Sequence, residues 1–68
     1  MNKAKQANND IREALKNNNV AQWELAEKAG YTPSYFSVKM RHEFSGEEKF
    51  DLFCMIQQIV EERGDTDA

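Results

Sequence analysis

Apolar residues recur at helical spacing in four segments of the chain, and polar stretches separate these segments. The segments are residues 10–16, 21–29, 33–41 and 46–62. Each repeats apolar side chains three or four residues apart, which places them on one face of a helix. No stretch alternates apolar and polar residues for long enough to form a strand. The pattern therefore predicts an all-α fold, a small four-helix domain.

The ends of the first and fourth helices carry local start and stop signals. We expect Asn9 to cap the first helix and the asparagines at 17–19 to end it, because asparagine tolerates left-handed turns. Ser45 and Glu48 have the spacing of a capping box in front of the fourth helix. The inward positions that we expect are Ile11, Ala14 and Leu15 in the first helix, and Phe50, Phe53, Ile56 and Val60 in the fourth, with Leu52 and Ile59 beside them.

The two central helices are joined by the most informative turn of the chain. Gly30 follows the last apolar position of the second helix, where a left-handed residue commonly ends a helix. Thr32 then offers a cap, and Pro33 suits the first position of a new helix. Phe36 and Met40, one turn apart, face inward. The arrangement is a helix-turn-helix, a motif that commonly delivers its second helix to the major groove of DNA.

The segment around this turn resembles the helix-turn-helix of small phage-repressor-like DNA-binding domains. That family's pattern is a glutamine, two residues, Leu-Ala, two residues, Ala-Gly, a hydrophobic residue and then Ser or Thr. The matching positions here are Gln22, Leu25, Ala26, Ala29, Gly30, Tyr31 and Thr32. Residues 23–26 and 39–43 are also similar to segments of short helical proteins from Gram-positive phages and mobile elements. Many repressor-like domains have a hydrophobic residue at the place of Lys39, whereas here Met40 takes the inward position.

The resemblance covers about residues 9–63 and implies a sequence-specific DNA-binding protein, a transcriptional regulator of a phage or mobile element. Helix 33–41 would then enter the major groove, where Val38 can meet a thymine methyl group and Arg41 can grip a guanine or a phosphate. In relatives with this pattern, the glutamine that matches Gln22 contacts a backbone phosphate. The DNA-binding residues that we expect are Gln22, Thr32, Pro33, Ser34, Tyr35, Ser37, Val38, Lys39 and Arg41.

Several residues have a structural interpretation beside a functional one. We expect Trp23 and Cys54 to lie in the core, since a small domain needs apolar volume. Ala26 marks the crossing of the two central helices, where a larger side chain would push them apart. The Tyr35 ring either stacks on the sugar–phosphate backbone or packs on the fourth helix. Thr32 acts first as a cap, and its hydroxyl group can face a phosphate as well.

The charge of the chain changes sign along its length. Its 68 residues carry a formal net charge of −3. Residues 1–42 hold seven Lys or Arg and four Asp or Glu, whereas residues 43–68 hold two and eight. No acidic residue occurs between Gly30 and His42. Because charges farther apart than about 8 Å are largely screened at physiological salt, the stretch from 30 to 42 can bind phosphate despite the overall acidity.

The polar ends of the chain set the expected domain limits. We expect a flexible N-terminal arm at residues 1–8, whose Lys3 and Lys5 can reach a neighbouring phosphate. The helix-turn-helix domain then covers 9–63, and a disordered polar tail covers 64–68. No apolar stretch approaches the roughly 18 residues of a membrane span, and the first residues lack a signal-peptide core. These features favour a cytoplasmic, nucleoid-associated protein without a membrane partner.

Catalysis and metal binding have little support in the sequence. His42 has no second histidine, and the single cysteine, Cys54, lies twelve residues away, so the ligands of a zinc site are missing. No glycine-rich phosphate loop and no set of nucleophile, histidine and acid occurs. One cysteine cannot form an internal disulfide, which fits a reducing compartment. We therefore expect neither an enzyme nor a cofactor.

The sequence leaves open how the protein acts. One recognition helix contacts only about four or five base pairs, so relatives commonly dimerise on paired half-sites. Helix 46–62 offers a candidate homodimer surface, with Met55, Phe44 and Leu52 outside the core. A second hypothesis is a protein-interaction module, an anti-repressor or accessory factor, whose acidic half at 43–68 docks a basic partner. A third is an accessory recombination protein that bends DNA. The lack of acids around the third helix favours double-stranded DNA as the partner.

Overall fold

Four α-helices and no strand make up the part of the chain that the computed structural model describes, residues 6–67 for the backbone and 6–64 for the side chains. The helices are α1 (Asn9–Asn17), α2 (Gln22–Ala29), α3 (Pro33–Lys39) and α4 (Gly46–Asp67). The expected all-α, four-helix architecture is confirmed. Lys3 and Lys5 of the expected N-terminal arm lie outside the described residues.

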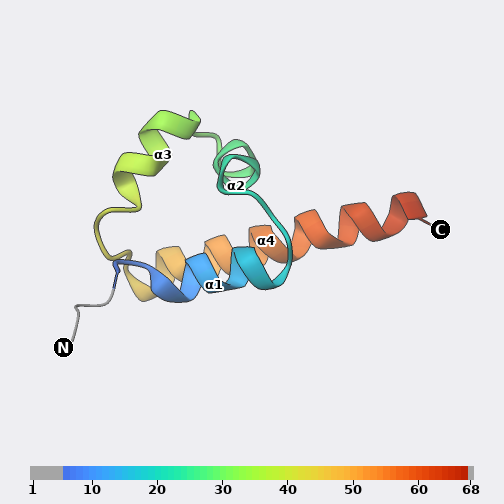
Figure 1. The fold of residues 1–68 in the computed structure, drawn as a ribbon, viewed down its shortest axis with the longest axis horizontal. Helices are drawn as coiled ribbons and strands as arrows, with labels where there is room; N and C mark the ends of the chain where they lie inside the picture. The colour runs from blue at the N-terminus through green and yellow to red at the C-terminus, as the bar shows by residue number, and fades with distance from the viewer. Residues whose placement is uncertain (1–5, 68) are drawn as a thin grey trace.

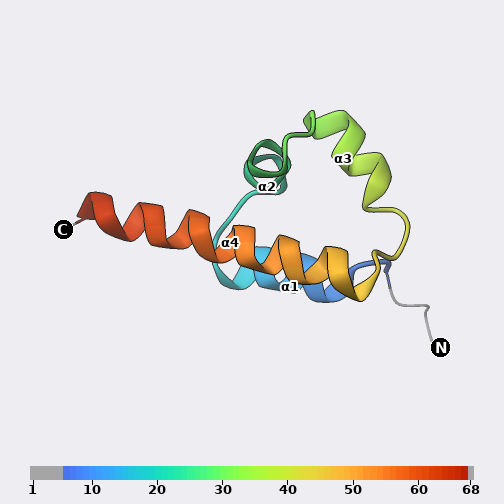
Figure 2. The ribbon, with the colours of Figure 1, turned by 180° about the vertical axis from the view of Figure 1, so that it is seen from behind.

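The four helices form two pairs, and we call the pair of α1 and α4 the base. α1 and α4 lie side by side, and α2 and α3 stand together on one side of this pair (Figure 1 and Figure 2). The last turns of α4 extend beyond the other three helices in both views. α3 is therefore the element farthest from the base, connected through α2 on one side and through the 40–45 loop on the other.

Ten apolar side chains from all four helices and from the connecting segments form the core. They are Ile11, Leu15, Val20, Leu25, Ala26, Phe36, Met40, Leu52, Ile56 and Ile59. The inward positions expected for Phe36 and Met40 are confirmed, and both side chains are fully buried. Ala26 is also fully buried, and its carbonyl oxygen accepts a 2.9 Å hydrogen bond from the Tyr31 N–H. The backbone of the turn thus closes directly onto this alanine, which leaves little room for a larger side chain.

The turn between α2 and α3 has the expected local chemistry. Gly30 ends α2 with φ +86°, a left-handed conformation that costs glycine little. The Thr32 hydroxyl oxygen accepts a 3.2 Å hydrogen bond from the Tyr35 N–H, and Pro33 begins α3. α3 is shorter than expected, since it ends at Lys39 and not at residue 41. The order of two short helices around a glycine turn is therefore as predicted.

The face that α4 turns to the core matches the expected one in part, since Ile56 is buried as expected and Val60 packs partly buried against the core. The buried side chains of α4 are Leu52, Ile56 and Ile59. The side chains of Phe50 and Phe53, expected inside, are 67% and 37% exposed. Met55 and Phe44, expected outside, pack partly buried against the core. The residues that we expected at a dimer surface, Met55, Phe44 and Leu52, are thus buried or partly buried, and Phe50 and Phe53 are the exposed aromatic residues of α4.

A polar cluster at the start of α4 fixes this rotation. Lys49 lies one turn before Leu52 on the buried side, and its ammonium nitrogen is 3.0 Å from Asp10 Oδ2 and also contacts Glu43. The hydrogen bond from Lys49 lowers the pKa of the Asp10 carboxyl group and that of Glu43 below their ordinary values. The lysine thereby ties α4 to α1 and to the preceding loop. The Ser45–Glu48 capping box is present as expected, with 3.2 Å bonds in both directions.

A second set of polar contacts explains why α4 continues past Glu62. Arg63 donates to the carbonyl oxygen of Asn19 at 2.7 Å and to the carboxylate of Glu24 at 2.7 and 2.9 Å. Lys28 pairs with Glu62 at 2.6 Å. These contacts hold the helix against α2 and the α1–α2 loop. The helix then runs on through residues 64–67, which we had expected to form a polar tail.

Asn8, which we had placed in the flexible arm, is fully buried and joins the N-terminal segment to the loop after α3. Its side-chain nitrogen donates to the carbonyl oxygens of Met40 at 3.0 Å and His42 at 2.8 Å. Its side-chain oxygen accepts a 2.8 Å hydrogen bond from the Phe44 N–H. Asn8, and not Asn9, is also the cap residue of α1, with φ +59°. The ordered domain therefore begins before residue 9.

Two residues expected in the core lie at the surface. Trp23 is 54% exposed, because Leu25 and Ala26 supply the buried face of α2 and Trp23 points to one flank of it. Cys54 is exposed on the outer side of α4. Both expectations were wrong, because aliphatic residues fill the limited interior: Leu25 and Ala26 in α2, and Leu52, Ile56 and Ile59 in α4.

Candidate nucleic-acid interface

α3 presents a polar outer face because two residues anchor its inner side. Phe36 and Met40, four residues apart, are buried and fix the rotation of the helix. Seven of the nine residues predicted to bind DNA are exposed along this segment. They are Thr32, Pro33, Ser34, Tyr35, Ser37, Val38 and Arg41. The structure thus brings these seven together on one continuous stretch of surface.

The chemistry of this outer face combines short hydroxyls, one apolar side chain and one guanidinium group. Ser34 and Ser37 offer hydroxyl groups that both donate and accept hydrogen bonds. The Val38 side chain is 51% exposed, and Arg41 follows it just beyond the helix end, its N–H donating to the Val38 carbonyl at 3.1 Å. These groups are of the kinds that contact base edges, thymine methyl groups and phosphates.

Lys39 occupies a different position from the rest of the predicted set. Its ammonium nitrogen lies 5.5 Å from the ring centroids of Tyr31 and Tyr35 and 5.9 Å from that of Phe44. Cation–π attraction to three rings therefore holds this charge at the side of α3. The side chain is half-buried and packs at the end of α3. Its charge adds to the local potential of α3 from the flank.

The Tyr35 ring contacts the α2–α3 turn, and its stacking on a sugar–phosphate backbone stays a prediction. The ring packs edge-on against Tyr31, with 5.4 Å between centroids, and 53% of the side chain remains exposed. The Tyr31 ring in turn stacks on Phe36 at 5.9 Å. The Tyr35 contact is thus to the α2–α3 turn, which leaves much of its surface open at the edge of the α3 face.

Gln22 is the first residue of α2 and is partly buried. The helix N-terminus beside it is capped by Glu24, whose carboxylate accepts a 2.8 Å hydrogen bond from the Ala21 N–H. That bond, together with the contact to Arg63, lowers the pKa of Glu24 below its ordinary value. The Glu24 carboxylate therefore lies near Gln22 at the start of α2. The Gln22 side chain is the uncharged group there that can form hydrogen bonds.

Asn8 is the residue of this region that the sequence did not indicate. The two carbonyl groups that it holds, those of Met40 and His42, flank Arg41. Arg12 adds a 3.4 Å hydrogen bond to the Met40 carbonyl oxygen. The backbone around Arg41 is therefore fixed from the N-terminal segment. An asparagine in the run at 8–9 signals a left-handed residue, but its distant partners leave no trace in the local sequence.

The part of the chain with described side chains contains no group of three or more His, Cys, Asp or Glu that could hold a metal ion. His42 lies exposed in the loop after α3. No helix within the described residues is long and apolar enough to span a membrane.

No protein-family model, curated protein or solved structure matches this chain. The similarity of Gln22–Thr32 to phage-repressor-like domains accordingly stays a prediction from the residues themselves.

Proposed function

We propose that this protein binds double-stranded DNA sequence-specifically, as a phage-repressor-like transcriptional regulator, and inserts α3 into the major groove. The observation that carries the proposal is the α3 face: exposed, free of acidic residues between 30 and 42, and anchored from behind by Phe36 and Met40. A rigid helix that presents short polar side chains, a valine and an arginine suits the width of the groove. A nucleoid-associated location follows from this activity.

The distribution of charge supports α3 as the face toward DNA. Three acidic residues of α4, Glu47, Glu48 and Asp51, lie in its first two turns, and the other four lie beyond Val60, whereas Lys39 and Arg41 lie at the end of α3. Screening limits the reach of the acidic groups to about 8 Å at physiological salt, so the sign of the local potential decides where phosphates approach. Weak non-specific binding and a reliance on base contacts are the expected consequences of the overall charge of −3.

Selection of bound duplexes from a randomised pool, followed by fluorescence anisotropy with a labelled selected duplex, tests the proposal. Arg41→Ala is expected to weaken binding by about 1–3 kcal/mol and to leave the melting temperature unchanged. Lys16→Ala is the matched control, because it removes the same charge from an exposed site at the end of α1. If both variants lost the same DNA affinity, the loss would come from overall charge. That result would refute the placement of α3 in the groove.

A homodimer through α4 would supply the second recognition helix. Phe50 and Phe53 lie three residues apart on the exposed side of α4, where a second copy can cover them. Two copies of α3 spaced by about one turn of DNA, roughly 34 Å, would then read paired half-sites. The competing function, a protein-interaction module, has one specific observation in its favour, namely these same exposed rings beside the acidic residues of α4. Recovery of a stable complex with DNA would decide against it.

A further inference from the structure

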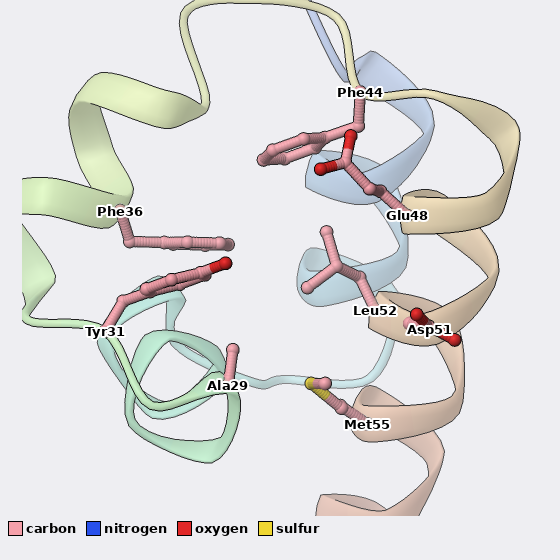
Figure 3. A pocket seen from close by; sticks show the side chains of 8 residues that line it. All are labelled: Ala29, Tyr31, Phe36, Phe44, Glu48, Asp51, Leu52 and Met55. Atoms are coloured by element: carbon pink, nitrogen blue, oxygen red, sulfur yellow. The ribbon is translucent and has the colours of Figure 1, made fainter.

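A cavity of about 110 Å³ lies between α4 and the α2–α3 segment (Figure 3). One wall is a stack of three rings, in which Tyr31 and Phe36 have centroids 5.9 Å apart and Phe36 and Phe44 have centroids 6.2 Å apart. Leu52 and Met55 of α4 form the opposite wall. Most of the lining is therefore apolar, which suits a hydrocarbon group more than a cluster of water molecules.

Polar groups reach into this apolar space from two elements. The Tyr31 hydroxyl group and the Glu48 carboxylate both point into the cavity (Figure 3), and Asp51 also lines it, with its carboxylate turned away from the rings. Glu48 Oε1 already accepts hydrogen bonds from the Ser45 N–H and hydroxyl at 3.2 and 3.3 Å. Its other oxygen, Oε2, has no hydrogen-bond partner among the described residues and is open to a donor from a ligand. Pockets with apolar walls and a few convergent polar groups are typical of ligand sites.

The size of the cavity limits what it can hold. It is larger than the volume of about 30 Å³ that one water molecule occupies in the liquid, and smaller than the cavity of about 150 Å³ that holds a benzene molecule. A chain of about four carbon atoms fits this space. The Glu48 carboxylate favours a positive charge at the end of that chain, since it would repel an anion and attract a cation more strongly than a neutral group.

The protein's own Lys39 places an ammonium group against two of the same aromatic rings, next to the cavity. Its ammonium group already lies against the rings of Tyr31 and Phe44, at 5.5 and 5.9 Å from their centroids. Lys39 borders a neighbouring groove and not the cavity itself, and Glu48 borders both. The glutamate thus stands between the resident ammonium group and the cavity, where it can balance a second positive charge.

We propose that this cavity binds a primary alkylammonium group, carried either by a free amine or by a lysine side chain of a partner protein. The apolar stem lies between the ring stack and Met55, and the ammonium group donates hydrogen bonds to Glu48 and to the Tyr31 hydroxyl oxygen. The site does not depend on DNA binding, so the two proposals stand or fall separately.

An NMR titration with n-butylammonium tests the proposal on the full chain. The methyl groups of Leu52 and Met55 are expected to shift with a dissociation constant in the millimolar range, as a ligand of this size allows. Butanol, which has the same chain length and no charge, is expected to bind about three- to fivefold more weakly. Equal binding of the amine and the alcohol, or no shift of these methyl groups, would overturn the proposal.

Two variants of the first turn of α4 separate the cavity from general charge. Glu48→Gln keeps the capping box, because glutamine serves in that position, and is expected to bring butylammonium affinity down to that of butanol. Glu47→Gln removes the same charge one residue earlier, outside the cavity lining, and is expected to leave the affinity unchanged. Equal effects of the two substitutions would refute a specific role of Glu48.

A third ligand distinguishes a free amine from the lysine side chain of a partner protein. Nα-acetyl-lysine N-methylamide carries the same butylammonium group on a peptide backbone. Binding at least as tight as that of butylammonium assigns the site to a partner's lysine, and clearly weaker binding assigns it to a free amine. Both results support the ammonium chemistry, provided that Glu48→Gln weakens the binding in each case and Glu47→Gln does not.

Discussion

Replacing Asn8 is expected to produce the largest loss of stability of any polar substitution in this chain. The side chain is fully buried and makes three hydrogen bonds, at 3.0, 2.8 and 2.8 Å, to the backbone of residues 40, 42 and 44. At a net contribution of about 0.5–1.5 kcal/mol each, the three bonds together stabilise the fold by about 2–4 kcal/mol. The free energy of unfolding of a chain of this size is about 3–10 kcal/mol, so the substitution removes much of the stability.

The choice of replacement separates the side chain from the backbone. Asn8 has φ +59°, which glycine adopts freely and alanine adopts at a cost of about 1 kcal/mol or more. Asn8→Gly therefore removes the hydrogen bonds without straining the backbone, and Asn8→Ala adds the backbone cost. Thermal unfolding followed by circular dichroism is expected to show a melting temperature lower by about 8–30 °C for Asn8→Gly and lower still for Asn8→Ala.

Asn9→Ala provides the control, since Asn9 is exposed and makes only a 3.4 Å contact to Glu13. Its melting temperature is expected to stay close to that of the wild type. Amide hydrogen exchange gives a second readout, because the Phe44 N–H donates to Asn8 Oδ1 and should lose its protection in Asn8→Gly. A melting temperature of Asn8→Gly equal to that of Asn9→Ala would refute the stabilising role of these bonds.

Three further predictions concern helix packing, pH and self-association. Ala26→Leu is expected to lower the free energy of unfolding by about 1–3 kcal/mol in denaturant titrations, because the α2–α3 crossing has no spare volume; an unchanged midpoint would contradict this. Since Lys49 lowers the pKa of Asp10 and Glu43, their contribution to stability is present above the ordinary values of 3.8 and 4.5 and is lost as the pH falls through the lowered values. The melting temperature should therefore be level from pH 7 to about pH 5 and fall below pH 4.5, and Lys49→Gln should flatten that fall; an equally steep fall in the variant would contradict the pairing. Phe50→Ser is expected to weaken any homodimer more than about tenfold in sedimentation equilibrium, as two largely exposed rings are lost per dimer, whereas an unchanged association constant would place the dimer surface elsewhere.

The features that the sequence predicted correctly depend on neighbours within a few residues. Gly30 at the end of α2, the Thr32 cap and the Ser45–Glu48 capping box each involve a single turn of backbone, so residue type and spacing determine them. The inward positions of Phe36 and Met40 followed from the same short range, because the other residues around them are small or polar. The exposed α3 face was therefore predictable almost residue by residue.

The features that the sequence missed depend on distant partners. α4 has apolar residues on more than one side, so helical spacing alone could not choose between Phe53 and Leu52. Lys49 and Arg63 decide the question, because their partners on α1, α2 and the loops draw the charged residues to the buried side. Asn8 is a similar case, since its bonds reach more than thirty residues along the chain. Local patterns assign such polar residues to the surface by default.

A ¹⁵N-edited NMR titration of the protein with a mixed-sequence duplex at low salt tests the central claim most directly. If α3 is the DNA-binding element, the shifts are confined to Gln22, residues 32–38 and Arg41, and they fade as salt rises and counterions compete for the phosphates. Shifts that leave these residues unchanged at low salt, or no shifts at all, would contradict the DNA-binding role of α3.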